Sequence, residues 1–347
     1  HNFMKFYDLD KIPNNIPTKD VVLSKNNFGE NLLIYGVPGC GKSYYIDVNY
    51  TLTADNSERI VFHPDYTYSD FVGQILPKVI TLKNSNGDPV IIKDENGNEI
   101  EQTLIDYKFI SGPFTRLLKK CENSDEMYYL IIEEINRGNA PAIFGEVFQL
   151  LDRSADTAFS QYSINNEDIA LEVYGEKTHP VKIPSNLTIL ATMNTADQNV
   201  FTLDTAFKRR WKMKAIRNKF TNDEHCSVQL CGTNLKWKDF ATKINAKIIE
   251  ASEENLGSED KRLGVYFLKD EEMSDCGAFS EKVLMYLWND VFKFDKSKVF
   301  DDKYKTLEDL LDAFANEKIR FNIFSSDLGF RELIATPGEK TEGEADE

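Results

Sequence analysis

Short apolar runs alternate with helical repeats along the first two thirds of the chain. Mainly apolar runs, each of a length that suits one buried strand, cover residues 31–36, 59–64, 128–134, 186–194 and, more weakly, 212–216. Apolar residues spaced three and four apart predict helices at residues 68–76, 112–123 and 141–153. Strands that alternate with helices in this way predict an α/β fold with a parallel sheet.

Two regions depart from this alternation. Residues 77–109 hold two Asn-Gly pairs between extended β-branched runs, which predicts a β-hairpin insertion near residues 80–105. After residue 216 only helical spacing remains. We therefore expect four parts, namely a leader at residues 1–20, an α/β nucleotide-binding domain at 21–216, a smaller all-helical subdomain at 217–335 and a disordered acidic tail at 336–347.

The composition limits the classes of protein that fit. A hydrophobic fraction of 41% and 23 Phe among 347 residues allow a substantial core. The net charge of −16 disfavours binding to nucleic acid, and the local basic stretch at residues 206–219 does not reverse this for the whole chain. Five Cys without paired spacing suit a reducing compartment such as the cytoplasm.

The sequence predicts neither a membrane span nor a signal peptide. No apolar run approaches about 18 residues, and no basic segment followed by an apolar one opens the chain. The chain begins with His1 rather than Met. The residues ahead of Met4 are therefore either a tag remnant or a sign that the chain is cut from something longer.

His225, Cys226 and Cys231 lie close together in the sequence, as zinc ligands often do. A structural zinc site needs about four ligands, and no Cys-x-x-Cys pair accompanies these three residues. We therefore interpret them as a helix end and a loop, and we predict no zinc site.

The segment GVPGCGKS at residues 36–43 fits the pattern of a phosphate-binding loop. Its glycines let backbone N–H groups turn toward a phosphate, and the helix that follows directs its positive end at the same anion. Lys42 would reach the β- and γ-phosphates, and the Ser43 hydroxyl would bind Mg²⁺. The predicted nucleotide-binding residues are Gly36, Val37, Pro38, Gly39, Cys40, Gly41, Lys42, Ser43 and Tyr44.

The apolar run YYLIIEE at residues 128–134 ends on two carboxylates. A phosphate-binding loop needs a second strand whose end brings carboxylates to the metal and to the attacking water. Glu133 would then face Mg²⁺, usually through water, and Glu134 would act as the general base. The alternative is that the two residues simply begin a solvated loop.

Two further segments supply candidate catalytic groups. The run at residues 186–194 ends on Asn194, whose amide either orients the attacking water or caps a turn. Arg209 and Arg210 follow soon after. They either form local salt bridges, or one of them is an arginine finger, a guanidinium that a neighbouring subunit supplies to the transferring phosphoryl group.

Four blocks together resemble the AAA+ motor module of the McrB family, the modification-dependent restriction GTPases. The blocks are GVPGCGKS, FHPDYTYSDFVGQILP, IIEEINRGNAPAIFGEVFQLLDR and ATMNTADQNVFTLDTAFKRRW. The resemblance covers residues 25 to 215 well and the helical part more loosely. It implies a P-loop NTPase fold with a helical lid and a hexameric ring that hydrolyses nucleotide between subunits, with GTP rather than ATP as the nucleotide. It also implies an McrC-type nuclease partner that is driven along DNA.

The same resemblance implies roles for single residues and also shows departures. It implies that Asn194 senses the γ-phosphate with support from Asp197, and that Arg262 is a lid residue at that phosphate. This chain has Glu133 where the family usually has Asp, and the extra methylene moves the carboxylate by about 1.5 Å. The family's DNA-reading domain precedes the motor, so here we expect DNA contact only through the complex or through a missing domain.

Two other functions stay open. The first is a nucleotide-gated assembly module with little turnover, to which the departure at Glu133 points. The second is an ATP-driven remodeller of other proteins, because nothing in the phosphate-binding loop contacts the base and the choice between GTP and ATP stays undecided.

Overall fold

The structure is a computed structural model that describes residues 28–195, 201–221, 224–253, 259–317 and 320–330. The predicted leader, the predicted acidic tail and Asp197 lie outside the described residues.

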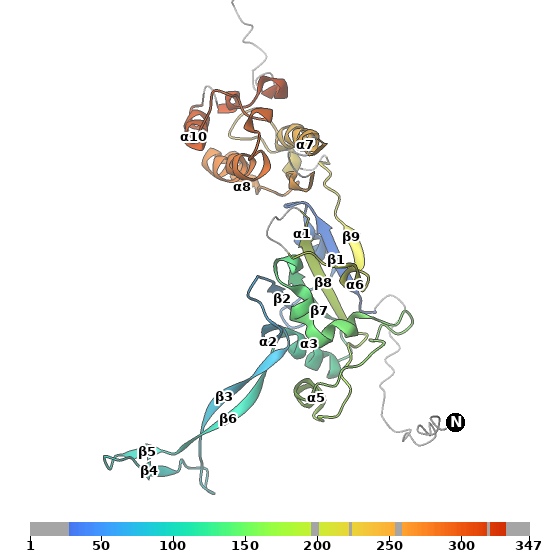
Figure 1. Ribbon diagram of the computed structural model, residues 1–347, viewed down its shortest axis with the longest axis vertical. Coiled ribbons are helices and arrows are strands. Elements are labelled where there is room, and N and C mark those ends of the chain that lie inside the picture. The colour runs from blue at the N-terminus through green and yellow to red at the C-terminus, as the bar shows by residue number, and fades with distance from the viewer. Residues whose placement is uncertain (1–27, 196–200, 222–223, 254–258, 318–319, 331–347) are drawn as a thin grey trace, which may run out of the picture.

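A five-stranded parallel sheet forms the centre of the first half of the chain (Figure 1). Its strands, in spatial order, are β2 (Ser57–Val61), β7 (Tyr128–Glu133), β8 (Leu187–Asn194), β1 (Asn31–Gly36) and β9 (Lys212–Ala215). All four neighbouring pairs run parallel. The predicted parallel α/β fold is thus confirmed, and the central strands are buried on both faces, as their unbroken apolar runs require.

The α-helices of this part are α1 (Lys42–Asn49), α2 (Tyr68–Phe71), α3 (Pro113–Glu122), α4 (Ala140–Phe144), α5 (Glu167–Tyr174) and α6 (Thr205–Lys208). Short 3₁₀ helices cover Ile135–Arg137 and Gly145–Leu151. A large hydrophobic core of this part includes Phe71, Phe114, Phe144 and Phe207. Ile46 of α1 belongs instead to a smaller cluster with Ile34 and Leu190 of the sheet.

Two predicted helices differ from the observed ones. The helix expected at residues 68–76 is only the four-residue α2, because the chain becomes extended at Gly73 and enters a long strand. The helix expected at residues 141–153 stops at Phe144. Gly145 has a φ of 51°, which a right-handed helix cannot accommodate, and a 3₁₀ helix continues from there. The predicted apolar face is nonetheless buried.

A two-stranded antiparallel ribbon, which we call the arm, projects from the α/β body near α2 and α3 (Figure 1). It consists of β3 (Gly73–Thr81) paired with β6 (Thr103–Ser111), and its outer part carries the short pair β4 (Ile91–Lys93) and β5 (Glu99–Glu101). The hairpin predicted near residues 80–105 is therefore real but longer at its base, where apolar residues were interpreted as helix.

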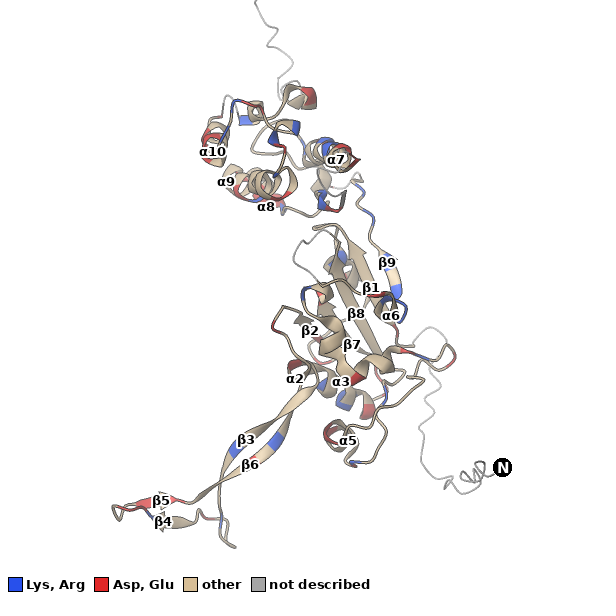
Figure 2. Ribbon diagram, viewed as in Figure 1, with Lys and Arg blue, Asp and Glu red and all other residues tan. Residues whose placement is uncertain are grey.

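One face of the arm is apolar and open. The register places Ile75 opposite Phe109, Pro77 opposite Tyr107, and Val79 opposite Ile105, so these six side chains share a face. The side chains of Val79 and Tyr107 are 65% and 69% exposed. Figure 2 shows few charged residues along β3 and β6. The arm therefore adds little buried apolar area to the folded state, and an isolated two-stranded ribbon is marginally stable in water.

Removal of the arm should leave the rest of the protein folded. We expect a variant that lacks residues 76–108, with Ile75 joined to Phe109 through Asn-Gly, to melt within about 3 °C of the wild type. The two joined residues are direct cross-strand partners, so a two-residue turn suits the junction. Thermal unfolding followed by circular dichroism measures this, and a drop of more than about 8 °C would show that the arm supports the core.

The second half of the described chain is helical and has its own core. Its α-helices are α7 (Trp237–Glu253), α8 (Asp270–Ser274), α9 (Cys276–Phe279) and α10 (Leu307–Ala315). π-helical segments cover Ser280–Leu284 and Leu287–Val291, and 3₁₀ helices cover His225–Ser227, Glu259–Lys261, Lys296–Lys298, Arg320–Ile323 and Ser326–Leu328. Aromatic rings, among them Phe240, Phe279 and Phe324, fill this core. In the described parts of the chain, no helix has the length and apolarity that crossing a bilayer requires.

Candidate active site

The phosphate-binding loop lies between the end of β1 at Gly36 and the start of α1 at Lys42. Gly39 and Gly41 have φ angles of 73° and 95°, a left-handed conformation that a residue without Cβ adopts at no steric cost. The loop thereby wraps around the N-terminus of α1, where backbone N–H groups and the helix dipole favour an anion.

The side chains of the loop are already held in place. The Lys42 ammonium donates to the carbonyl oxygens of Gly36 and Val37 at 3.2 and 3.1 Å, so it folds back over the loop. Cys40 is buried, and burial raises the pKa of its thiol above the ordinary value, which keeps it protonated near neutral pH. Lys42 thus lies beside the backbone that a phosphate would contact.

Glu133 ends β7 and lies between two partners on neighbouring strands. Its Oε2 accepts a hydrogen bond from the Thr192 hydroxyl on β8, and its Oε1 lies 3.1 Å from Nη1 of Arg59 on β2. Only 12% of the Glu133 side chain is exposed. The carboxylate is therefore fixed at the carboxyl end of the sheet rather than starting a solvated loop.

Glu134 has an unusual backbone conformation for a residue with a side chain. Its φ is 54°, its N–H donates to the Thr192 hydroxyl oxygen at 3.0 Å, and its carboxylate lies 2.7 Å from Nε of Arg137. A left-handed non-glycine residue costs about 1 kcal/mol or more and is often found at functional sites. The same hydroxyl therefore contacts both acidic residues and sets their relative positions.

Asn194 ends β8 directly beside the end of β1, because the register pairs it with Gly36. Its carbonyl accepts a hydrogen bond from the Asn136 side chain at 2.9 Å. Within the described residues, the buried atoms Asn136 Oδ1 and Thr195 Oγ1 have no hydrogen-bond partner. Buried polar atoms of this kind normally find a partner, so this end of the sheet is suited to a polar ligand or to water.

The structure thus brings five predicted residues to one edge of the sheet: Lys42, Ser43, Glu133, Glu134 and Asn194. Sequence reasoning missed Arg59, Thr192, Asn136 and Arg137, which orient them. Three of these four lie inside blocks that carry the family resemblance, Asn136 and Arg137 in IIEEINRG and Thr192 in ATMNTAD, whereas Arg59 lies outside every block.

The two candidate finger arginines have different surroundings. Arg210 pairs with Asp152 at 2.9 Å, lies 4.1 Å above the Phe148 ring centre, and its side chain is only 11% exposed. Arg209, one position earlier, is exposed at the end of α6. Arg210 therefore forms the local salt bridge that one of the two interpretations predicts, whereas the Arg209 side chain is open to solvent.

A loop of the helical part lies directly on the phosphate-binding loop. The Tyr266 N–H donates to the Gly39 carbonyl at 2.7 Å, and a Cβ atom on Gly264 would lie 2.2 Å from the Gly39 carbonyl carbon. Gly264 is therefore required for close backbone approach. The Tyr266 and Tyr44 ring centres are 5.9 Å apart. Arg262, the predicted lid arginine, immediately precedes this loop and is half-buried.

Several side chains fix this loop from behind. The Val265 carbonyl accepts from Trp237 Nε1 at 2.8 Å and lies 2.9 Å from His225 Nε2. His225 also contacts Asp270 through its other ring nitrogen. His225 and Cys226 lie in a 3₁₀ helix, and the part of the chain that the structure describes holds no cluster of three potential metal-ligating side chains. Of the three residues His225, Cys226 and Cys231, His225 is therefore the one that holds this loop.

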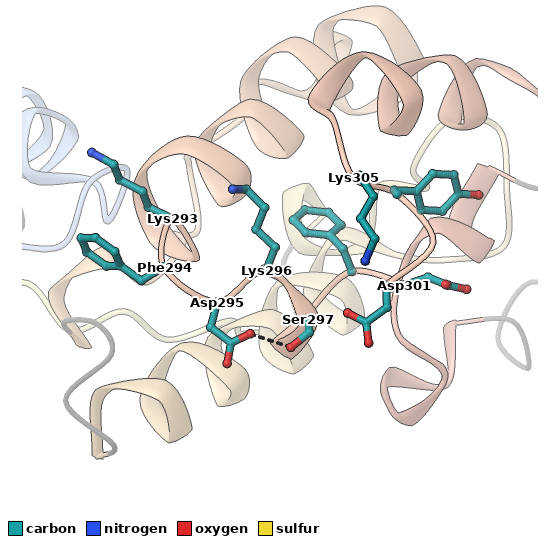
Figure 3. A pocket seen from close by; sticks show the side chains of 10 residues that line it. Lys293, Phe294, Asp295, Lys296, Ser297, Asp301 and Lys305 are labelled. Carbon is teal, nitrogen blue, oxygen red and sulfur yellow. Dashed lines mark hydrogen bonds between the residues drawn. The ribbon is translucent and has the colours of Figure 1, made fainter.

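A separate hollow of about 290 Å³ lies in the helical part, far along the chain from the phosphate-binding loop (Figure 3). Its lining comes from residues 293–305 and mixes Lys293, Lys296 and Lys305 with Asp295 and Asp301. The opposite charges are interspersed, and none of the candidate catalytic residues borders it. This hollow therefore does not contribute to the predicted nucleotide hydrolysis.

Comparison with known proteins agrees with the geometry of the sheet edge. Residues 31–211 match the AAA domain family, dynein-related subfamily. The chain belongs to this family. The match runs from the start of β1 to the residue that precedes β9, so it contains the phosphate-binding loop, both strand-end carboxylates and Asn194. As an AAA protein, the chain is an NTPase.

Two curated relatives extend the similarity beyond the AAA domain. The chain is 36% identical over 336 residues to the BsuMI type II restriction enzyme component YdiS of Bacillus subtilis (strain 168), covering 92% of this chain and 94% of that protein. It is 25% identical over 304 residues to the EcoKMcrB subunit, a type IV methyl-directed restriction enzyme of Escherichia coli (strain K12). That match covers 83% of this chain and 58% of the subunit, and it confirms the resemblance to McrB.

The residues at the sheet edge also fit Mg²⁺ bound with a nucleotide. The Ser43 hydroxyl and the Glu133 carboxylate are oxygen donors, which Mg²⁺ prefers. At phosphate sites this ion keeps several waters and takes few protein ligands, so such a site needs no cluster of three acidic side chains.

Proposed function

We propose that this protein hydrolyses a nucleoside triphosphate with Mg²⁺ as the motor subunit of a restriction complex, with GTP preferred to ATP. The observation that carries the proposal is the arrangement of Lys42, Glu133 and Asn194 at the carboxyl ends of the adjacent parallel strands β1, β7 and β8. In open α/β sheets, this edge is where ligands bind.

Each side chain then has a defined task. Lys42 leaves the carbonyls of Gly36 and Val37 and pairs with the β- and γ-phosphates. Ser43 and Glu133 would hold Mg²⁺, which would supply positive charge to neutralise the phosphate oxygens. Asn194 orients the attacking water, and Glu134 accepts its proton. The salt bridge to Arg137 engages Oε2 of Glu134, so Oε1 is the oxygen to which we assign the proton.

Arg209 completes the site from a neighbouring subunit. The proposal rests on its exposure and on the local pairing of Arg210. A guanidinium from another copy stabilises charge on the transferring phosphoryl group, so hydrolysis requires a ring, which we propose to be a hexamer. Asp197 and Arg262 remain proposed contacts of Asn194 and of the γ-phosphate.

The names of the two relatives support membership of a restriction system. We therefore propose an McrC-like nuclease as the partner subunit. DNA would be contacted through the complex, because the net charge of −16 disfavours direct binding by this chain. We also propose that residues 21–216 and 217–335 act as motor domain and lid, with the hairpin insertion as an attachment to the motor.

A second candidate function is a nucleotide-gated assembly switch with little turnover. The observation that favours it is that both strand-end carboxylates are engaged by arginines of the same chain, Glu133 by Arg59 and Glu134 by Arg137. If nucleotide closes the ring without freeing Glu134, binding alone would shift the population of assembled states. A protein remodeller driven by ATP is the third candidate, and no contact described here favours it.

The motor proposal predicts that hydrolysis per subunit rises with protein concentration, because a ring must form before Arg209 can reach its neighbour's site. Turnover of GTP and of ATP, measured over a dilution series that spans assembly in size-exclusion chromatography, tests this. We expect a sigmoidal rise that coincides with assembly and a higher rate with GTP.

Three results would redirect the proposal. A specific activity that stays flat while the oligomer dissociates would remove the need for a trans arginine. A faster rate with ATP would favour the remodeller, and assembly with nucleotide but negligible turnover at every concentration would favour the switch.

A further inference from the structure

The carboxylate of Glu133 has a cationic partner that no role in hydrolysis explains. Arg59, on strand β2, directs Nη1 to Glu133 at 3.1 Å and its other amino group to Asp47 on α1. Arg59 therefore links α1, the helix that begins with Lys42 and Ser43, to β7, the strand that ends at Glu133.

The sheet explains how Arg59 reaches this position. Strand β2 lies at the edge of the sheet and pairs in parallel with β7, with Val61 opposite Glu133. Arg59 lies two residues before Val61, so its side chain leaves the sheet on the same face. A long side chain from there can extend along the strand toward the carboxyl end, where it meets Glu133.

The length of Glu133 is matched to this contact. An aspartate at position 133 would withdraw the carboxylate by about 1.5 Å. If Arg59 keeps its position, a shift of that size directed away from it would take the carboxylate from 3.1 Å to beyond hydrogen-bond distance. Glu133, which stands where the family usually has Asp, is therefore long enough to reach Arg59 on β2.

We propose that Arg59 is a positioning residue that holds Glu133 when the metal is absent and competes with Mg²⁺ for it. This rests on the proposed function, in which Glu133 faces the metal. A fixed guanidinium charge beside the carboxylate reduces its attraction for a dication. Mg²⁺ must therefore displace the Arg59 contact or tolerate its charge, and nucleotide binding becomes dependent on a higher Mg²⁺ concentration.

A purely structural role is a weak explanation for the contact between Arg59 and Asp47. The side chains of Arg59 and Asp47 are 38% and 52% exposed, and ion pairs at that exposure contribute little to stability. Strand β2 offers a matched comparison, because the adjacent residue Glu58 pairs with Arg116 at 2.7 Å, and neither is a candidate active-site residue.

The test measures the Mg²⁺ dependence of nucleotide binding rather than turnover. The full-length protein binds a fluorescent GTP analogue during titration with MgCl₂ after treatment with EDTA, and the midpoint is compared among wild type, Arg59→Gln, Arg59→Lys and Arg116→Gln. We expect Arg59→Gln to lower the Mg²⁺ midpoint roughly three- to tenfold. Arg59→Lys, which keeps the charge, should change the midpoint less, and Arg116→Gln should leave it unchanged.

Each outcome separates the inference from the proposed function. A midpoint for Arg59→Gln that equals or exceeds that of the wild type, with an unchanged melting temperature, overturns the competition. An equal decrease in Arg116→Gln also overturns it, since the effect would then be general. If the wild type binds the nucleotide with no Mg²⁺ dependence at all, the metal role of Glu133 fails instead.

Discussion

Replacing Arg209 with alanine should lower hydrolysis per subunit by roughly three to five orders of magnitude, the range reported for arginine fingers. Arg209 is exposed on its own subunit, so its removal should cost little stability. Nucleotide affinity should also change little, because the finger acts mainly on charge that develops in the transition state. Steady-state phosphate release, with fluorescent-nucleotide binding alongside, measures both quantities.

The neighbouring arginine is the matched control. Arg210→Ala removes the partner of Asp152 and the cation above the Phe148 ring, so we expect a loss of roughly 1–3 kcal/mol of stability with turnover of the folded fraction nearly intact. The reverse pattern, with Arg210→Ala inactive but stable and Arg209→Ala active, would exchange their assignments. Mixing Arg209→Ala with Glu134→Gln subunits should restore part of the activity, since some interfaces would then combine both intact groups.

Replacing Glu134 with glutamine should lower turnover by about 10²- to 10⁴-fold, because the amide cannot accept the proton of the attacking water. Nucleotide binding and ring assembly should persist, since the phosphate-binding loop and Glu133 are unchanged. Single-turnover hydrolysis, together with nucleotide affinity, distinguishes loss of chemistry from loss of binding.

Glu172→Gln serves as the control for this substitution. Glu172 on α5 pairs with Lys119 on α3 at 2.7 Å, neither is a candidate active-site residue, and the replacement of Glu172 should leave turnover unaffected. If Glu134→Gln and the wild type hydrolyse at the same slow rate while both assemble with nucleotide, the switch function becomes the better description.

The sequence predicted the parallel sheet because buried strands leave a strong signal. The run at Asn31–Gly36 has the observed bounds of β1, since Gly36 marks where the chain must turn. The apolar pattern gives a wrong prediction where the same residues fit both helical and strand spacing. In the segment that holds α2 and the base of the arm, Ile75 is spaced from Phe71 as in a helix but instead lies on the apolar face of β3. Only pairing with β6, 30 residues further along, shows this.

In the candidate site, too, some features could be predicted from the sequence and others could not. Lys42, Glu133 and Asn194 could be predicted to converge, because parallel strands bring their carboxyl ends to one edge. The contacts of Arg59 and Thr192 could not, since they depend on which strands are neighbours, and spacing along the chain does not give that order. Arg209 and Arg210 are adjacent and chemically alike, so only their surroundings separate them.

The arm has a consequence for how such a protein can diversify. A two-stranded ribbon that is joined to the body at Gly73 and Ser111 can lengthen or shorten by paired insertions, at an entropic cost that grows only slowly with length. An AAA domain of this kind can therefore keep its α/β body while the length of this ribbon varies. Where another molecule binds the apolar face of the arm, substitutions on that face would accumulate more slowly than substitutions at the tip.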